Sequence, residues 1–381
     1  MMILSAAPVR AWWMRWKTWP KSYTLKSSNK SFGPILIVRS GWGRNLADMK
    51  KTSSWIILVL ALGAALALSV HIGAVSIPLG EIWRALFGQA ANPAHHTILW
   101  DIRLPRTVLI ALTGAALGGS GAAYQGLFRN PLADPYLIGV ASGAGLGAVL
   151  AMSLRWPYSF WGLMAVPAAA FLAAMGTVLV VMALARSGQA LPTANLILAG
   201  VAVSSFASAL TSFLMLRSTG ELRRALAWLL GGAALGGWQA VGVMLPYLLI
   251  GLGGLMISGH ALNVLQFGDE QAQQLGLNVA RVRMGILLAA ALSTAAAVAF
   301  AGIIGFIGLI VPHVMRLLFG PDYRALIPRS ILGGATALLL ADVLARVLLA
   351  PQELPVGVIT ALAGAPFFLW LLRRSKTQGI G

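Results

Sequence analysis

The stretch that decides the fold is residues 103–145, which reads RLPRTVLIALTGAALGGSGAAYQGLFRNPLADPYLIGVASGAG. It begins with Arg103 and Arg106 and continues as an apolar helix over roughly 104–127. A helix of this length can cross a bilayer, which needs about 20 residues. Its many glycines and alanines let helix backbones approach closely within lipid. The polar run RNPLADP then interrupts it before a second glycine-rich apolar segment. The stretch therefore predicts a tightly packed membrane hairpin.

The composition extends this prediction to the whole chain. Of the 381 residues, 58% are hydrophobic and 10% are charged, whereas a soluble domain carries roughly 25% charged residues. We therefore expect an all-α polytopic membrane protein with about ten transmembrane helices. Apolar runs of spanning length lie near residues 55–73, 104–127, 136–154, 161–185, 194–216, 238–258, 282–302, 304–319, 328–350 and 355–373.

The net charge of +18 is concentrated at the two ends of the chain. Ten of the 28 basic residues lie within residues 1–51, and Arg373, Arg374 and Lys376 lie near the other end. Such a distribution is a topology signal and not a nucleic-acid-binding face. We expect both termini to be cytoplasmic and the number of spans to be even. This topology places Arg103, Arg106 and Arg346 at the outer ends of spans.

Two regions are expected along the chain. Residues 1–51 form a basic tail rich in tryptophan, which is interpreted either as a membrane-surface segment or as sequence upstream of a natural start at Met49. Residues 52–376 form a single transmembrane domain.

No pattern in the chain predicts catalysis. The spanning body contains no lysine, so a GxxxxGK[ST] phosphate-binding loop is excluded there. The sequence also lacks HExxH, GxSxG and any cysteine. We therefore expect no enzyme activity, and no metal or cofactor bound by this chain.

Four motifs in chain order resemble the permease family of bacterial ABC importers for iron–siderophores, haem and vitamin B12. They are RLPRT, FRNPLADPYLIGVASGAG, GFIGLIVPHVMRLL, and LLLADVLAR followed by ELPVGVITALAGAPFFLWLL. The resemblance spans about Trp55 to Arg374. It implies the type II ABC importer permease fold, a homodimer in the bacterial inner membrane, and alternating access. It also implies a cytoplasmic ATPase dimer that uses ATP and Mg, and a periplasmic or lipid-anchored binding protein that delivers an iron chelate, haem or cobalamin.

The resemblance assigns Arg103, Arg106 and Arg346 to docking of the binding protein, because arginine suits carboxylate partners. The alternative is pairing within the chain, Arg103 with Asp101 and Arg346 with Asp342.

The resemblance places a cytoplasmic gate at the break after the first long helix and at the loop before the fifth span. Asn130, Leu132 and Thr193 are the gate candidates. Proline at 131 and 192 disfavours helix at both places. An ordinary cytoplasmic turn is the alternative.

The fifth span carries a stripe of hydroxyl side chains, which fits a wet pathway at the dimer axis. Helix–helix contact through small residues is the alternative. The pathway candidates are Ser204, Ser208, Thr211 and Ser212.

Residues 263–281, NVLQFGDEQAQQLGLNVAR, are expected to hold a short cytoplasmic helix after Gly268. We expect Leu275 and Leu277 to be exposed to the cytosol, where they need a partner. The resemblance makes this helix the contact with the ATPase; a solvated loop is the alternative. The candidate residues are Glu270, Leu275, Gly276 and Leu277.

Two other functions stay open from the residues alone. An ion-coupled secondary transporter needs buried ionisable groups, and Asp134, Asp342 and Glu353 are the candidates. An intramembrane enzyme would need a catalytic set, which the sequence does not offer.

Overall fold

The structure is a computed structural model that describes residues 41–73, 75–88, 92–154, 160–188, 191–217, 222–231, 237–350 and 352–378. The chain divides into two units, Met1–Asp48 and Met49–Gly381. The contacts below belong to the second unit. The expectation for residues 1–51 falls mostly outside the described residues, and the domain division at residue 52 stays a prediction.

All regular elements in the described ranges are helices. In chain order they are α1 (Gly41–His71), α2 (Leu79–Leu86), α3 (Pro93–Thr97), the π-helix η1 (Ile98–Arg103), α4 (Leu104–Leu127), α5 (Val140–Met152), α6 (Phe160–Ala185), α7 (Thr193–Arg217), α8 (Leu222–Leu229), α9 (Trp238–Ile257), α10 (Gly259–Leu265), α11 (Asp269–Gln274), α12 (Val279–Ala301), α13 (Ile307–Phe319), α14 (Tyr323–Val347) and α15 (Val356–Gln378).

The ten expected spans correspond to ten apolar helices in the described residues. Seven are long and apolar enough to cross a membrane, and α5, α13 and the described part of α15 are shorter. The expected span at 136–154 is wrong in length, since α5 begins only after Gly139, whose φ is +85°. The expected span at 304–319 is also too long, because Phe306 at φ +69° precedes α13.

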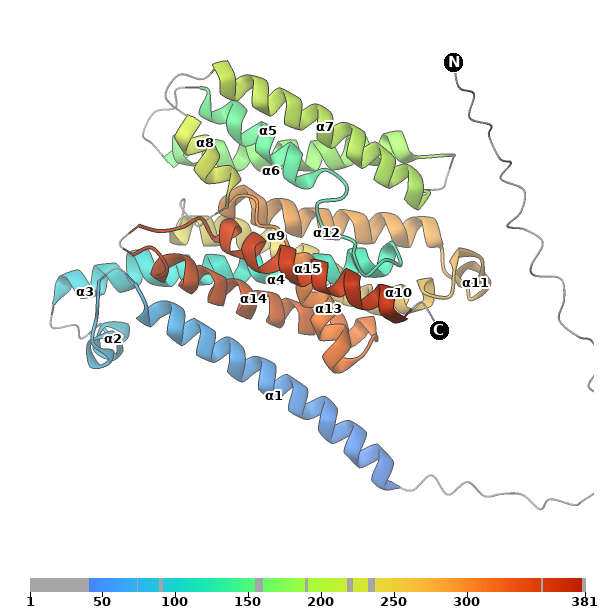
Figure 1. The fold of residues 1–381 in the computed structure, drawn as a ribbon, viewed down its shortest axis with the longest axis horizontal. Coiled ribbons are helices and arrows are strands. Elements are labelled where there is room, and N and C mark those ends of the chain that lie inside the picture. Colours follow the sequence, from blue (N-terminus) through green and yellow to red (C-terminus); the bar gives the residue numbers. More distant parts are fainter. Residues whose placement is uncertain are drawn as a thin grey trace, which may run out of the picture. The chain divides into compact units, whose positions relative to one another are not determined.

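The core is built around α4, which lies against α9, α12, α13 and α14 (Figure 1). A Cβ atom added to Gly114 would overlap the carbonyl group of Gly334 on α14, and one added to Gly121 would overlap the backbone of Gly308 on α13. The glycines of the 103–145 stretch therefore bring helix backbones into direct contact, as the sequence predicted. The α5, α6 and α7 helices pack on one another as a second layer beside α12 (Figure 1).

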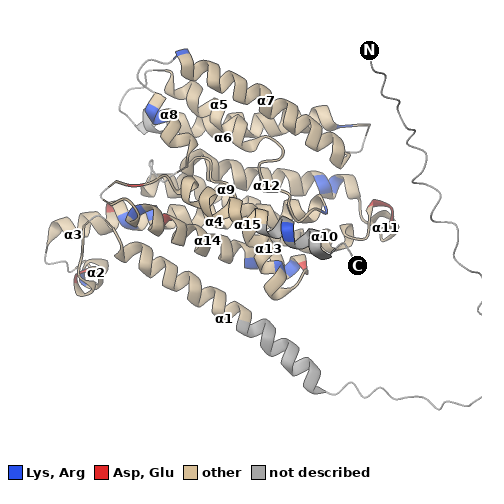
Figure 2. Cartoon of the chain, viewed as in Figure 1, with Lys and Arg blue, Asp and Glu red and all other residues tan. Residues whose placement is uncertain are grey.

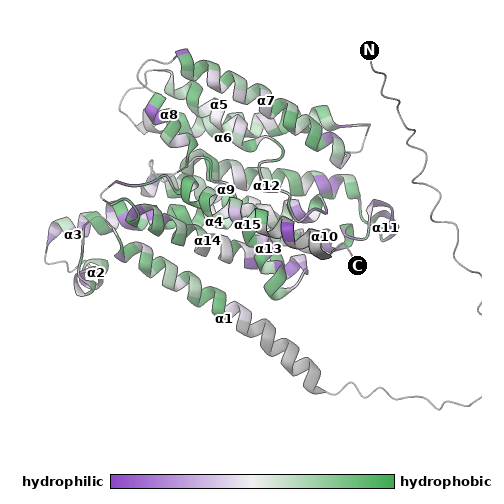
Figure 3. Ribbon diagram, in the orientation of Figure 1, coloured by the Kyte–Doolittle hydropathy of each residue, from purple (hydrophilic) through white to green (hydrophobic). Residues whose placement is uncertain are grey.

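Polar residues gather at the two ends of this bundle. The middles of the helices are hydrophobic (Figure 3), and coloured charges lie mainly near helix ends and in the connecting segments (Figure 2). We call the end that carries α2 and α3 the α3 end, and the end that carries α10 and α11 the α11 end. The α4 helix runs from the first to the second, so residues 103–106 and 128–135 lie at opposite ends.

Candidate functional site

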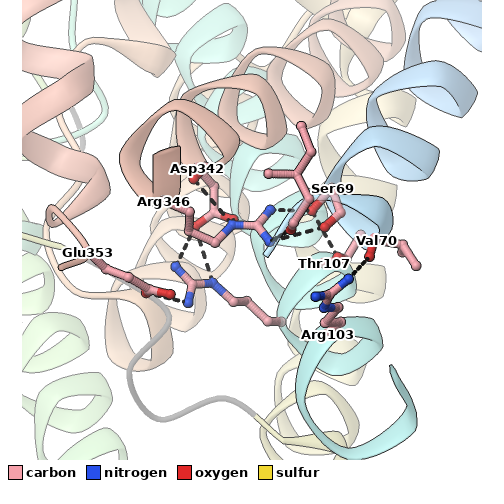
Figure 4. Close-up of polar contacts among 9 residues, drawn as sticks. Ser69, Val70, Arg103, Thr107, Asp342, Arg346 and Glu353 are labelled. Atoms are coloured by element: carbon pink, nitrogen blue, oxygen red, sulfur yellow. Dashed lines mark hydrogen bonds and ion pairs between the residues drawn. The ribbon is translucent and has the colours of Figure 1, made fainter. Parts of the chain in front are cut away.

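An ion-pair cluster at the α3 end joins α4 to α14. The guanidinium of Arg106 on α4 lies 2.9 Å from Asp342 on α14 and 2.6 Å from Glu353 in the segment that follows. Arg346, one turn after Asp342, lies 3.1 Å from the other oxygen of that carboxylate. The Asp342 side chain is 1% exposed, so both arginines neutralise a buried charge (Figure 4).

The same cluster binds the end of α1. Arg346 donates to the carbonyl of Ser69 at 3.1 Å, to the carbonyl of Ile72 at 2.5 Å and to the Ser69 hydroxyl at 3.0 Å. The last carbonyls of a helix have no partner within it. Arg346 therefore supplies donors that the helix itself lacks, and the Ser69 hydroxyl continues the network to Thr107 at 2.9 Å.

Arg103 has a similar structural use. Its guanidinium donates to the carbonyl of Val70 at 2.9 Å (Figure 4). It also donates to the carbonyl of His71 at 2.9 Å and to that of Val75. The alternative pairing with Asp101 is therefore wrong. Pairing of Arg346 with Asp342 is confirmed, and the pairing of Asp342 and Glu353 with Arg106 had not been expected from sequence.

The three arginines expected to dock a binding protein differ in access. Arg103 and Arg346 are buried, at 5% and 9% exposure, whereas the side chain of Arg106 is 22% exposed. The docking role of all three remains a prediction, and Arg106 is the one most open to a carboxylate from outside the chain.

The break after α4 is a pair of side-chain-stabilised turns. Arg129 has φ +50°, and the side chain of Asn130 accepts from the backbone N–H of Leu132 at 2.9 Å. Asp134 accepts likewise from the N–H of Tyr136 at 2.8 Å. Proline at 131 and 135 explains why helix does not continue. Asn130 is exposed, and Leu132 is half-buried.

The expected cytoplasmic helix is α11. Gly268 at φ +109° precedes it and Gly276 at φ +84° follows it, as the sequence indicated. Leu275 is 67% exposed. Leu277 differs from expectation, because it turns back and packs partly against the hydrophobic core. Glu270 is exposed beside Asp269 at the first turn.

An ion-pair network at the α11 end joins this helix to both expected gate segments. Asp269 lies 3.1 Å from Arg129 in the break and 3.0 Å from Arg283 on α12. Arg283 in turn donates to the carbonyl of Leu191 at 2.8 Å, two residues before Thr193 begins α7. Neither arginine was singled out from sequence, since nothing local marks pairs 140 and 92 residues apart.

The hydroxyl stripe of α7 divides between two faces. Thr211 is buried and donates to the carbonyl of Ala207 at 2.8 Å, so it lies against the protein body. Ser208 and Ser212 are exposed. Ser204 lines an open cavity of about 470 Å³ together with Asp134, Tyr136 and Phe306. The pathway role of the four residues remains a prediction, for which Ser204 has the most suitable surroundings.

Comparison with known proteins identifies the family. Residues 58–374 match the FecCD transport family. The chain belongs to the FecCD transport family. A permease of unassigned function from Bacillus subtilis, YvrB, is 41% identical over 90% of this chain and 99% of its own length. The cobalamin import permease BtuC of Halobacterium salinarum is 41% identical over 91% of this chain and 94% of its own length. The hemin transport permease HmuU of Yersinia pestis is 40% identical over 86% of this chain and 95% of its own length.

A solved structure agrees with this assignment. The chain resembles a metal-chelate type ABC transporter in an inward-facing conformation with a TM-score of 0.73 and 31% identity, covering 84% of this chain and 99% of that one. Membership in the FecCD family makes the chain a multi-pass, all-helical permease subunit of an ABC importer, as the sequence motifs indicated.

Proposed function

We propose that two copies of this chain form the membrane pore of an ATP-driven importer for an iron chelate, haem or cobalamin. A binding protein delivers the cargo at the α3 end, a separate ATPase dimer drives the complex from the α11 end, and the two ends open alternately. The α11 end faces the cytoplasm together with both termini, in the bacterial inner membrane. Cargo is inferred from the names of relatives that import cobalamin and hemin.

The observation that carries this proposal is the placement of two unlike polar sites at opposite ends of one apolar bundle. At the α3 end, Arg106 presents a partly exposed guanidinium, which suits an acidic docking partner. At the α11 end, Leu275 exposes two thirds of its surface on a short polar helix. A single exposed leucine is common on protein surfaces, so its support for an ATPase contact lies in its place on this short helix, at the end opposite Arg106.

The ion-coupled alternative loses support from the ion pairs. Asp342 and Glu353 are both paired with Arg106, so these two carboxylates are already neutralised. Asp134 remains, and it lines a cavity that is open. The arrangement suits passage of a bulky solute better than a dehydrated cation site, which needs several converging oxygens.

Purification of the complex tests the partners. The chain is expressed with candidate ABC ATPase and binding-protein subunits from its own genome. The mass of the purified complex is measured, and docking of the binding protein loaded with cobalamin, haemin or ferric citrate is assayed. We expect two permease and two ATPase chains. Arg106→Glu should weaken docking by more than about tenfold, because it opposes like charges, while the ATPase stays bound. Since Arg106 also pairs with the buried Asp342, docking is compared only for complexes whose melting temperature shows that the permease is folded. Docking unchanged by Arg106→Glu would contradict the proposed docking site.

A further inference from the structure

The inference concerns Asp269, the first residue of α11. Its carboxylate accepts from two arginines that come from different parts of the fold. Arg129 belongs to the break after α4 and donates at 3.1 Å. Arg283 belongs to α12 and donates to both carboxylate oxygens, at 3.2 and 3.0 Å. A carboxylate bound in this way by guanidinium groups has a fixed direction as well as a strong attraction.

Arg283 extends the connection to a third segment. Its side chain is buried at 7% exposure, and its other terminal nitrogen donates to the carbonyl of Leu191 at 2.8 Å. Leu191 is itself 3% exposed and is two residues from the start of α7. The Asp269 carboxylate thus binds the segment after α4 directly, at Arg129. It is connected to the segment before α7 through Arg283, which bridges Asp269 and the Leu191 carbonyl. We call Asp269, Arg129, Arg283 and the Leu191 carbonyl the Asp269 clasp.

Apolar packing behind α11 is thin, which gives the clasp its importance. The helix has six residues, of which Ala272 is the one classed as buried. A pocket of about 440 Å³ lies beside this helix, and residues of α11, of the segment before α7 and of the start of α12 line it: Leu191, Asp269, Gln273, Leu277, Asn278, Val279, Ala280 and Arg283. Close-packed side chains transmit displacement because they cannot be compressed. An open pocket does not transmit displacement in this way, so the directed ion pairs form the stiffer connection between α11 and the two gate segments.

We propose that Asp269 is the positioning residue that transmits movement of α11 to the two gate segments at residues 129–132 and 191–193. The inference rests on the proposed function, in which α11 contacts the ATPase and these segments close the inner end. A displacement of α11 carries both arginines with it while Asp269 is charged. Replacement by a neutral amide removes the negative charge and one of the two acceptor oxygens, which weakens the attachment of both Arg129 and Arg283 to α11.

The test uses the full complex of permease, ATPase and binding protein in proteoliposomes. Because the sequence contains no cysteine, a Thr193→Cys change gives one spin-label site in each permease chain. The distance between the two labels, one in each permease chain of the dimer, is measured by double electron–electron resonance with and without ATP. This background then receives Asp269→Asn, Asp269→Glu, Arg129→Gln or Arg283→Gln. Arg281→Gln is the matched control, because Arg281 is exposed two residues from Arg283 on the same helix.

We expect Asp269→Asn to leave the complex assembled and its ATP hydrolysis within about twofold of the parent, as is usual for a change that spares the packed core. The ATP-dependent change in label distance should be lost, and cargo moved per ATP should fall by about tenfold, a usual size for coupling between sites. Asp269→Glu should keep part of the distance change and part of the transport per ATP. Arg129→Gln and Arg283→Gln should each reduce these two quantities in part. Arg281→Gln should change neither quantity.

The outcomes separate this inference from the proposed function. A full distance change in Asp269→Asn and Arg129→Gln would overturn the clasp while leaving the importer intact. Loss of hydrolysis in proportion to transport would also overturn it, since that pattern indicates a failed ATPase contact. If Asp269→Asn does not assemble, Arg129→Gln decides, because the side chain of this arginine is 41% exposed and lies outside the buried core. A parent complex without any ATP-dependent distance change would refute the proposed gate itself, and the inference with it.

Discussion

Arg106 on α4 donates to Glu353 across 2.6 Å, and the pair closes the ion cluster of the α3 end on its outer side. Glu353 is 46% exposed, so it is held by Arg106 and by little else. The partner of Arg106 inside the bundle, Asp342, is 1% exposed and cannot be exchanged without opening the fold. If Arg106 docks the binding protein as proposed, Glu353 occupies the position that a carboxylate of that protein would take.

Glu353→Gln should strengthen docking of the binding protein. The change removes an internal competitor for Arg106, and exposed pairs of this kind are worth about 0.2–1 kcal/mol, so the affinity should rise by about 1.4- to fivefold. The dissociation constant is measured by surface plasmon resonance on complexes in nanodiscs. Glu81→Gln is the control, since Glu81 also lies at the α3 end but pairs with Arg84 and His95 on α2 and α3. An equal gain from both changes would indicate general charge attraction and contradict the competition.

Asp342→Asn should strongly destabilise the permease. It leaves the guanidinium groups of Arg106 and Arg346 close together without a shared counter-charge, and loss of one member of a buried ion pair costs about 3–5 kcal/mol. Thermal unfolding of the detergent-purified chain measures the effect. Asp101→Asn makes the same chemical change at an exposed position of the same end and should leave the melting temperature unchanged. Equal melting temperatures for the two variants would show that the cluster contributes nothing to the fold.

Gly121→Ala should damage the packing of α4. Its new methyl group would overlap the backbone of Gly308 on α13, and overpacking of a core costs about 1–3 kcal/mol or more. Gly285→Ala on α12 is the matched control, because a Cβ there meets nothing within 4 Å. Fluorescence-detected size exclusion and thermal melting compare the yield of folded protein. Equal behaviour of the two variants would mean that the close contact between α4 and α13 is not needed.

Leu275→Asp and Leu277→Asp should fail in different ways. Leu275 is exposed, so its replacement should detach the ATPase while the permease keeps its own melting temperature. Leu277 packs partly against the core, and a buried charge there should lower the melting temperature of the permease alone. Co-purification with the ATPase and melting of the free permease are measured on both variants. A complex that survives Leu275→Asp would exclude α11 as the main ATPase contact.

The sequence predicted the features of this protein that are local or periodic. Apolar runs located the membrane helices, because a bilayer requires a continuous apolar surface. Gly268 and Gly276 located the bounds of α11, because both have a positive φ. The pairing of Asp342 with Arg346 was also accessible, because residues four apart on a helix lie on the same face.

The features that the sequence did not predict depend on contacts between distant segments. Arg106 meets Asp342 236 residues away, and Arg129 meets Asp269 140 residues away, and no periodic pattern encodes such pairs. Hydropathy also overestimated the lengths of α5 and α13. The segments before these helices are apolar in composition, but the backbone turns at Gly139 and Phe306. The alternative of an Arg103–Asp101 pair fails for the same reason, because the open carbonyls at the end of α1 provide several acceptors for one guanidinium.

Uptake into proteoliposomes shows whether this permease moves its cargo only together with an ATPase. Vesicles containing the permease and its ATPase are given binding protein loaded with radiolabelled cobalamin, haemin or ferric citrate, with ATP and Mg inside or outside. The proposed import function requires that one of the three cargoes accumulates when ATP lies on the side of the ATPase, and that none accumulates without ATP or without the ATPase subunit. Uptake by the permease alone, driven by an ion gradient and stopped by an uncoupler, would contradict it.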